Sequence, residues 1–154
     1  MKTFDLILAN TTRSEVYLNE FIDKNYLPNR VLYIENDSGM PMMGQNTFES
    51  VATSSAKPIQ IMNALSEYNI DYIKINNAEL ETEATYNWLE HCKSDFIVYS
   101  GFGGKILSRN FFKFPTPILH AHGGILPRYR GSTCNYYTFF KKIWSSTIII
   151  VWFE

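Results

Sequence analysis

Short apolar runs alternate with amphipathic helical patterns along this chain, and that alternation is the feature that most restricts its fold. The runs lie at residues 4–9, 30–35, 71–75, 95–100 and 117–120, and they predict five strands. The first run is apolar apart from Asp5, which is typical of a strand covered on both faces. Strands that alternate with helices join through right-handed crossovers. The sequence therefore predicts an α/β fold with a doubly wound, mostly parallel sheet.

Two of the predicted helices begin at a capping pattern. Thr12 and Glu15 have the spacing of a capping box, and apolar residues on one helical face follow them. Asn76 and Glu79 suggest a second capped start, for a helix that continues to Cys92.

Length, charge and cysteine content limit the class of protein. A chain of 154 residues suits one domain with a substantial core. Its formal net charge of −1 does not favour binding to nucleic acid or to an anionic membrane. Cys92 and Cys134 follow no metal spacing and are interpreted as reduced thiols. The apolar run at residues 147–153 is far shorter than the ~20 residues of a membrane helix. We expect a soluble, cytoplasmic protein.

The segment at residues 119–131 carries the strongest functional signal, because it combines two imidazoles, three glycines and two guanidiniums. His120 and His122 lie two residues apart, so their side chains point the same way on an extended segment. The segment follows a predicted strand, and ligands bind at the carboxyl ends of strands in doubly wound sheets. An imidazole with a reference pKa of about 6.5 suits proton transfer at neutral pH. The segment therefore predicts a ligand-facing loop with an acid–base histidine.

Other interpretations of these residues stay open. His120 and His122 would supply two ligands of a metal shell that needs a third, and the remaining histidine, His91, lies well before them. Arg128 and Arg130 suit bidentate binding of phosphate, or they belong to a solvated surface turn.

The glycine-rich segment at residues 101–104 follows the fourth predicted strand. It lacks the third glycine and the later acidic residue of a dinucleotide fingerprint, which disfavours a nicotinamide cofactor. Its glycines instead permit close approach of the backbone to a flat ring or to the next helix. Both glycine-rich segments follow strands, so one crevice could use both.

Two segments resemble the folate-dependent formyltransferases. His122-Gly-Gly-Ile-Leu-Pro-Arg-Tyr-Arg-Gly131 resembles their H-P-S-L-L-P-x-Y-R-G signature. The segment at residues 95–107 looks like the hydrophobic strand and G-Y-G-x-I-L turn that precede it. The resemblance is specific from about residue 95 to residue 137. It implies a Rossmann-like catalytic domain that transfers a formyl group from 10-formyltetrahydrofolate to an amine.

The resemblance also implies roles for individual residues. His122 matches the family histidine, which would accept the proton of the attacking amine and help to polarise the formyl oxygen. The family asparagine aligns with His120, whose ring N–H could still donate to the oxyanion. No metal ligand is expected. The remaining implied contacts are with the folate cofactor, at Gly101, Phe102, Gly103, Gly104 and Leu126, and with the substrate, at Arg128, Tyr129, Arg130 and Gly131.

The expected acceptor follows from departures within the signature. Gly123 and Gly124 replace the usual Pro-Ser, and residues 131–137 look closer to members that act on sugar nucleotides. We therefore expect a nucleotide-linked amino sugar as the substrate and neither nucleic acid nor membrane as a partner. A homo-oligomer is compatible with this expectation.

The C-terminal segment departs from the family pattern. The family aspartate lies a few dozen residues past the histidine, whereas this chain stops at Glu154. We expect a catalytic domain at residues 1–142, an atypical, truncated tail at 143–154, and reduced activity. The run at residues 148–153 is expected to pair with other chains at a bare sheet edge. Two alternative functions are a catalytically inactive folate- or nucleotide-binding module and a metal-dependent hydrolase that uses the His-x-His pair.

Overall fold

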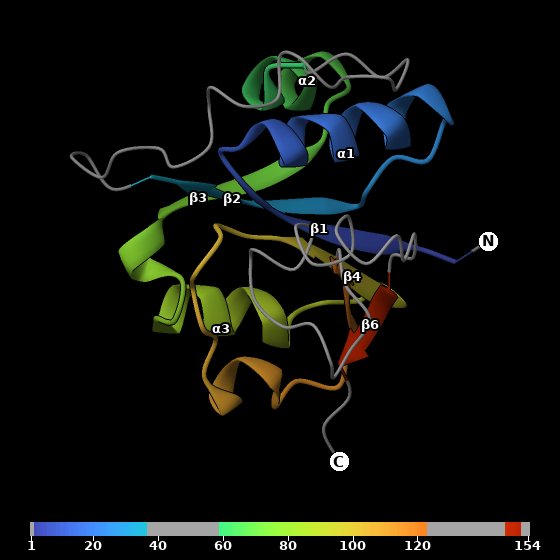
Figure 1. The fold of residues 1–154 in the computed structure, drawn as a ribbon. Helices are drawn as coiled ribbons and strands as arrows, with labels where there is room; N and C mark the ends of the chain where they lie inside the picture. Colours follow the sequence, from blue (N-terminus) through green and yellow to red (C-terminus); the bar gives the residue numbers. More distant parts are fainter. Residues whose placement is uncertain (1, 37–58, 123–146, 152–154) are drawn as a thin grey trace, which may run out of the picture.

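One six-stranded sheet organises the part of the chain that the computed structural model describes, which is residues 2–36, 59–122 and 147–151 (Figure 1). Its strand order is β3-β2-β1-β4-β5-β6. The first five strands are parallel, and β6 runs antiparallel to β5. The predicted doubly wound, mostly parallel sheet is therefore confirmed. The strands are β1 (Phe4–Ala9), β2 (Arg30–Glu35), β3 (Asp71–Asn76), β4 (Phe96–Ser100), β5 (Ile118–His122) and β6 (Thr147–Val151).

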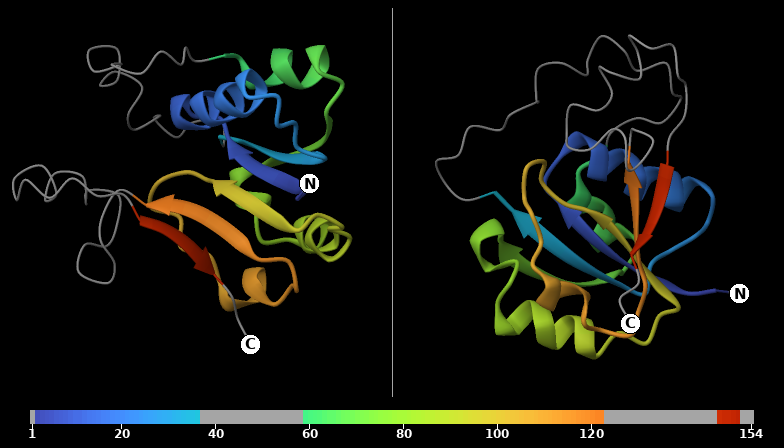
Figure 2. Two further views of the ribbon diagram at one scale, coloured as in Figure 1. Left: turned by 90° about the vertical axis from the view of Figure 1, so that its right-hand side faces the viewer. Right: turned by 60° about the horizontal axis from the view of Figure 1, so that its bottom comes forward.

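Helices cover both faces of the sheet (Figures 1 and 2). Helices α1 (Thr12–Asp23) and α2 (Ile61–Glu67) lie on one face, and α3 (Glu83–Glu90) and the 3-10 turn η2 (Arg109–Phe112) lie on the other. Side chains of β1 alternate between the two cores. Leu6 and Leu8 join the cluster that includes Leu18 of α1, whereas Ile7 and Ala9 join the cluster on the α3 side. The apolar run of β1, broken only by Asp5, thus reflects burial on both faces.

The start of α1 lies one residue earlier than the predicted capping box. Thr11, with an extended backbone, is the N-cap, and its side chain accepts a hydrogen bond from the Ser14 backbone N–H at 3.3 Å. The expected Thr12–Glu15 box is therefore wrong, because Thr12 already belongs to the helix. The helix ends at Asp23, and Asn25, with φ of 58°, closes a Schellman-type turn. In this turn the backbone N–H groups of Asn25 and Tyr26 donate to the carbonyl oxygens of Ile22 and Phe21.

The single helix predicted from Asn76 to Cys92 is two elements. The capping box of Asn76 and Glu79 forms, but it caps only a 3-10 turn, η1 (Asn77–Glu79). Helix α3 then begins separately after Thr82, and His91 caps its C-terminus with Nδ1 2.8 Å from the Asn87 carbonyl oxygen. Leu80, between the two elements, is buried, so the break carries an apolar side chain into the α3-side core.

The apolar run near the C-terminus contributes a strand to the sheet. Strand β6 pairs with β5 of the same chain, from Ile118 opposite Val151 to His122 opposite Thr147. Strand β6 is the end strand of the sheet in the described part of the chain, so the expected pairing with other chains through its outer edge stays a prediction. The pairing of β5 with β6 also keeps both histidines of the motif in extended conformation.

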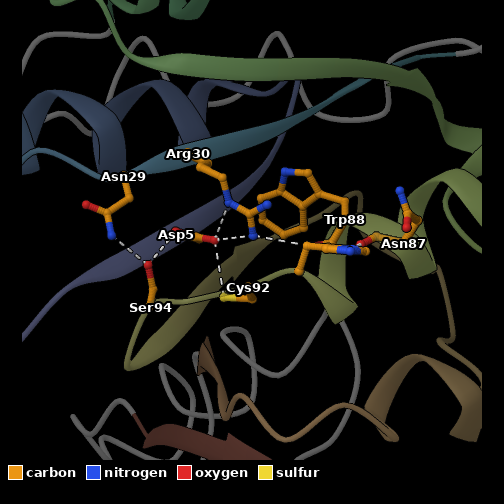
Figure 3. A network of polar contacts seen from close by, with 8 residues as sticks. Asp5, Asn29, Arg30, Asn87, Trp88, Cys92 and Ser94 are labelled. Atoms are coloured by element: carbon orange, nitrogen blue, oxygen red, sulfur yellow. Dashed lines mark hydrogen bonds and ion pairs between the residues drawn. The ribbon is translucent and has the colours of Figure 1, made fainter.

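A buried polar network lies at the amino ends of β1 and β2 (Figure 3). The Asp5 carboxylate is completely buried and accepts hydrogen bonds from Arg30 Nε at 2.9 Å and Nη2 at 2.7 Å. Ser94 and Cys92 donate to the same carboxylate, and the Arg30 guanidinium lies 4.4 Å from the centroid of the Trp88 ring. The one charged residue in the apolar run of β1 therefore joins three segments that are distant in sequence.

Candidate functional site

The candidate site lies where the strand order reverses. Strands β2 and β3 follow β1 on one side of it, and β4 and β5 follow on the other, so β1 and β4 flank the topological switch point. In doubly wound sheets a crevice forms there, beyond the carboxyl ends of the strands. Three segments meet at this end of the sheet: the start of α1, the turn after β4 and the end of β5.

The first turn of α1 is attached to the end of β4. Arg13 donates from Nε to the Ser100 hydroxyl at 3.2 Å and from Nη2 to the carbonyl oxygen of Gly101. The Ser14 hydroxyl donates to the Ser100 carbonyl at 3.1 Å and lies 2.9 Å from the Ser100 hydroxyl. Ser14 and Ser100 are both fully buried. These bonds fix a cation at the switch point, a feature that sequence reasoning missed because the partners are 86 or more positions apart.

The end of β5 separates from β4 where the histidine motif begins. The β4–β5 ladder pairs only Ile97 with Ile118 and Val98 with Leu119. Beyond this pair, the carbonyl oxygen of Tyr99 is 3.0 Å from Nδ1 of His120. An imidazole thus takes a strand carbonyl as its partner at the position where the two strands part. Sequence patterns predicted an extended motif, but not this contact.

His120 and His122 lie beside each other on β5, as their spacing predicted. Their ring centroids are 6.4 Å apart and both side chains are half-buried. His120 also makes an edge contact with the Tyr99 ring, at 5.8 Å between centroids. Burial lowers the pKa of His120, and the nearby Arg13 and His122 lower it further, against the opposing effect of the bond to Tyr99. His120 is therefore biased toward the neutral imidazole.

Tyr99 explains the glycine that follows β4. Its phenol ring is buried and folds back over Gly101, where an added Cβ would overlap the ring and hydroxyl. Of the two targets left open for this glycine turn, a flat ring or the next helix, the contact at Gly101 is with a ring, the Tyr99 side chain. Burial raises the pKa of Tyr99 to about 12, so the hydroxyl stays protonated at neutral pH. Among the described residues, this hydroxyl has no hydrogen-bond partner.

Replacing Gly101 with alanine is expected to destabilise the protein by about 1–3 kcal/mol, because the new methyl group forces the Tyr99 ring out of its position. Urea unfolding measures this difference. Gly104→Ala is the control for loss of a glycine without a clash. Gly104 has φ of 83° and open space around it, so alanine there costs only the backbone strain, about 1–2 kcal/mol. Adding Tyr99→Ala should reduce the cost of Gly101→Ala only; an unchanged cost would exclude the Tyr99 clash as its cause.

Only some of the other predicted folate- and substrate-contacting residues lie in the part of the chain that the structure describes. Phe102 is half-buried and packs against the α3-side core, and Gly103 and Gly104 are exposed. Their contact with a folate remains a prediction. The predicted contacts at Leu126, Arg128, Tyr129, Arg130 and Gly131 lie outside the described residues.

A metal shell is not completed by the described part of the chain. Within residues 2–36, 59–122 and 147–151, three histidine, cysteine or carboxylate side chains do not come together in a metal-binding arrangement. His91, at the end of α3, caps its own helix instead. In the same ranges, no helix has the length and apolar character needed to cross a membrane.

Comparison with known proteins gives a partial match in sequence. No family model matches the chain. The methionyl-tRNA formyltransferase of Finegoldia magna is 35% identical over 80 residues, which are 51% of this chain and 25% of that protein. The chain thus matches about a quarter of the length of this curated relative.

Comparison with solved structures gives the fold. Phosphoribosylglycinamide formyltransferase from Anaplasma phagocytophilum superposes with a TM-score of 0.60 at 14% identity, covering 99% of this chain and 66% of that one. The enzyme from Streptococcus pneumoniae gives 0.58 at 13% identity, covering 100% and 74%. The fold is therefore the one these formyltransferases have. Together with the sequence match, it confirms the resemblance to the folate-dependent formyltransferases.

Proposed function

We propose, from this likeness to the folate-dependent formyltransferases, that the chain carries an N-formyltransferase site at the carboxyl end of its sheet. The formyl group would come from 10-formyltetrahydrofolate and pass to the amine of a small acceptor. The observation that carries the proposal is the pair His120 and His122, side by side on β5 and in the segment whose sequence resembles the family signature. The glycine turn at residues 101–104 follows β4 at the same end of the sheet.

The chemistry of these side chains suits acyl transfer to nitrogen. An amine that attacks a formyl carbon must lose a proton, and the formyl oxygen gains negative charge as the tetrahedral species forms. One imidazole can accept the proton while a second group donates a hydrogen bond to the oxygen. Arg13, fixed at the switch point, adds positive charge to the same region.

The acceptor that we propose is a nucleotide-linked amino sugar. Gly123, Gly124 and the sequence at residues 131–137 support this choice over the acceptors named for the similar proteins. Those proteins are a methionyl-tRNA formyltransferase and phosphoribosylglycinamide formyltransferases.

A transfer assay tests the proposal. The purified chain is incubated with 10-formyltetrahydrofolate and one acceptor at a time. The acceptors are nucleotide-linked amino sugars, glycinamide ribonucleotide and methionyl-tRNA. Release of tetrahydrofolate and a formylated amino-sugar product are expected. Formylation of one of the other two acceptors alone would keep the reaction and change the substrate. If none of the three acceptors is formylated but the chain binds the folate, the chain is a folate-binding module and not a formyltransferase.

A further inference from the structure

The contact between His120 and Tyr99 determines which ring nitrogen of His120 carries a proton. A backbone carbonyl oxygen can only accept a hydrogen bond, so Nδ1 at 3.0 Å from the Tyr99 oxygen must be the protonated nitrogen. In the neutral imidazole the other nitrogen, Nε2, is then unprotonated and carries a lone pair. His120 is thus a hydrogen-bond acceptor toward anything that meets Nε2.

Several features of the site keep His120 in this form. The β4–β5 ladder ends at the pair Val98–Leu119, so the Tyr99 carbonyl is available to the imidazole. Pairing with β6 holds the backbone of His120 extended, and the edge contact with Tyr99 restrains the ring. In the described part of the chain, the charged and titratable groups around it are Arg13 from α1, His122 on β5 and the Tyr99 phenol from β4. The two cationic or basic groups disfavour a second proton on His120.

We infer that His120 presents Nε2 to the amine nucleophile as its proton acceptor, and that it does not donate a hydrogen bond to the formyl oxygen. This inference rests on the proposed function and assigns the role of one residue in it. It differs from the expectation that His120 replaces the family asparagine as a donor. The donor to the oxygen must then come from another group, and His122 is the neighbouring imidazole.

The proton balance of the step follows from this assignment. The amine nitrogen bonds to the formyl carbon, and its proton moves to Nε2 of His120. The bond between the formyl carbon and the folate nitrogen then breaks, with its electron pair remaining on that nitrogen, which takes the proton back from His120. The products are a formamide and tetrahydrofolate, and His120 returns to its neutral form. The Tyr99 carbonyl accepts from Nδ1 throughout, so it stabilises the transient imidazolium.

The tautomer of His120 can be measured in the protein without any ligand. The chain has three histidines, so long-range proton–nitrogen spectra of histidine-labelled protein can be assigned with His91→Gln and His120→Asn. Above the titration range of imidazole, His120 is expected to carry its proton on Nδ1. His91 is an internal reference, because its Nδ1 also contacts a carbonyl oxygen, at 2.8 Å, but on an exposed helix end. A proton on Nε2 of His120 would overturn the inference.

The role in transfer is tested with His120→Asn, which supplies an amide donor at this position but no basic nitrogen. We expect kcat/KM to fall about 100-fold, the lower end of what general base catalysis contributes. We also expect the acid limb of the pH profile, which lies below the ordinary imidazole pKa in the unaltered chain, to disappear. His91→Gln should keep both the rate and the profile. A His120→Asn variant with an unchanged rate and profile would contradict the assignment.

The tautomer measurement and the transfer assay together distinguish failure of this inference from failure of the proposed function. If the unaltered chain formylates no amine, the proposed function fails, and the tautomer alone decides the hydrogen-bond polarity of His120. A proton on Nδ1 would then still support an acceptor at this position, and a proton on Nε2 would refute it.

Discussion

Replacing His122 with alanine is expected to lower formyl transfer by about 10²–10³-fold, the range for loss of a hydrogen-bond donor to a developing oxyanion. The variant removes the imidazole that matches the family histidine and lies 6.4 Å, between ring centroids, from His120. Because the effect is on the chemical step, kcat should fall while KM for the folate changes little. Steady-state kinetics with 10-formyltetrahydrofolate and the best acceptor measure both constants.

His91→Ala is the matched control for this variant. It removes the same type of side chain from the end of α3, where His91 is exposed and bonded to its own helix. Its transfer rate should equal that of the unaltered chain. Equal rates for His122→Ala and the unaltered chain, with both proteins folded, would remove His122 from the reaction.

Replacing Asp5 with alanine is expected to destabilise the protein by about 3–5 kcal/mol, the cost of leaving a buried ion without its partner. The carboxylate is fully buried and accepts hydrogen bonds from Arg30, Ser94 and Cys92 (Figure 3). Without it, the guanidinium of Arg30, whose side chain is only 23% exposed, keeps the Trp88 ring and one carbonyl but no anion among the described residues. This loss is a large part of the roughly 5–15 kcal/mol that stabilises a typical domain.

Chemical unfolding followed by circular dichroism measures the loss. Lys74→Ala is the control, because the ion pair of Lys74 with Glu35 at 2.7 Å is solvent-exposed and should cost only about 0–1 kcal/mol. Asp5→Asn keeps the shape of the side chain, so its loss of unfolding free energy should lie between those of Asp5→Ala and Lys74→Ala. It can still be measured if Asp5→Ala does not fold. A similar cost for Asp5→Ala and Lys74→Ala would show that the network is not a source of stability.

The sequence predicted the elements that depend on local periodicity. Apolar runs identified all five parallel strands, and the Asn76–Glu79 box marked the real start of an element, the 3-10 turn η1. The errors were of two kinds. The cap of α1 moved by one residue because Thr11 and Thr12 are both competent caps, and the helix expected up to Cys92 was broken so that Leu80 could be buried. The run at residues 147–151 pairs with the edge of β5, a contact that local periodicity does not predict.

The candidate site was predictable only in part. The two-residue spacing of His120 and His122 was enough to place both side chains on one side of a strand, because strand side chains alternate. The glycines at residues 101–104 indicated a close approach of the backbone to a flat ring or to the next helix. Which ring approaches was not predictable, because it depends on the Tyr99 side chain of β4 folding back over the residue that follows the strand.

By itself the sequence determined an alternating α/β chain with a histidine motif after its fifth strand, because periodicity and residue type act within a few neighbouring positions. Tertiary structure alone decided which donor meets which acceptor. Arg13 with Gly101, Asp5 with Arg30 and His120 with Tyr99 join residues from different elements of the fold. These partners are set by the register of β1, β2, β4 and β5, and that register follows from the packing of two cores on one sheet.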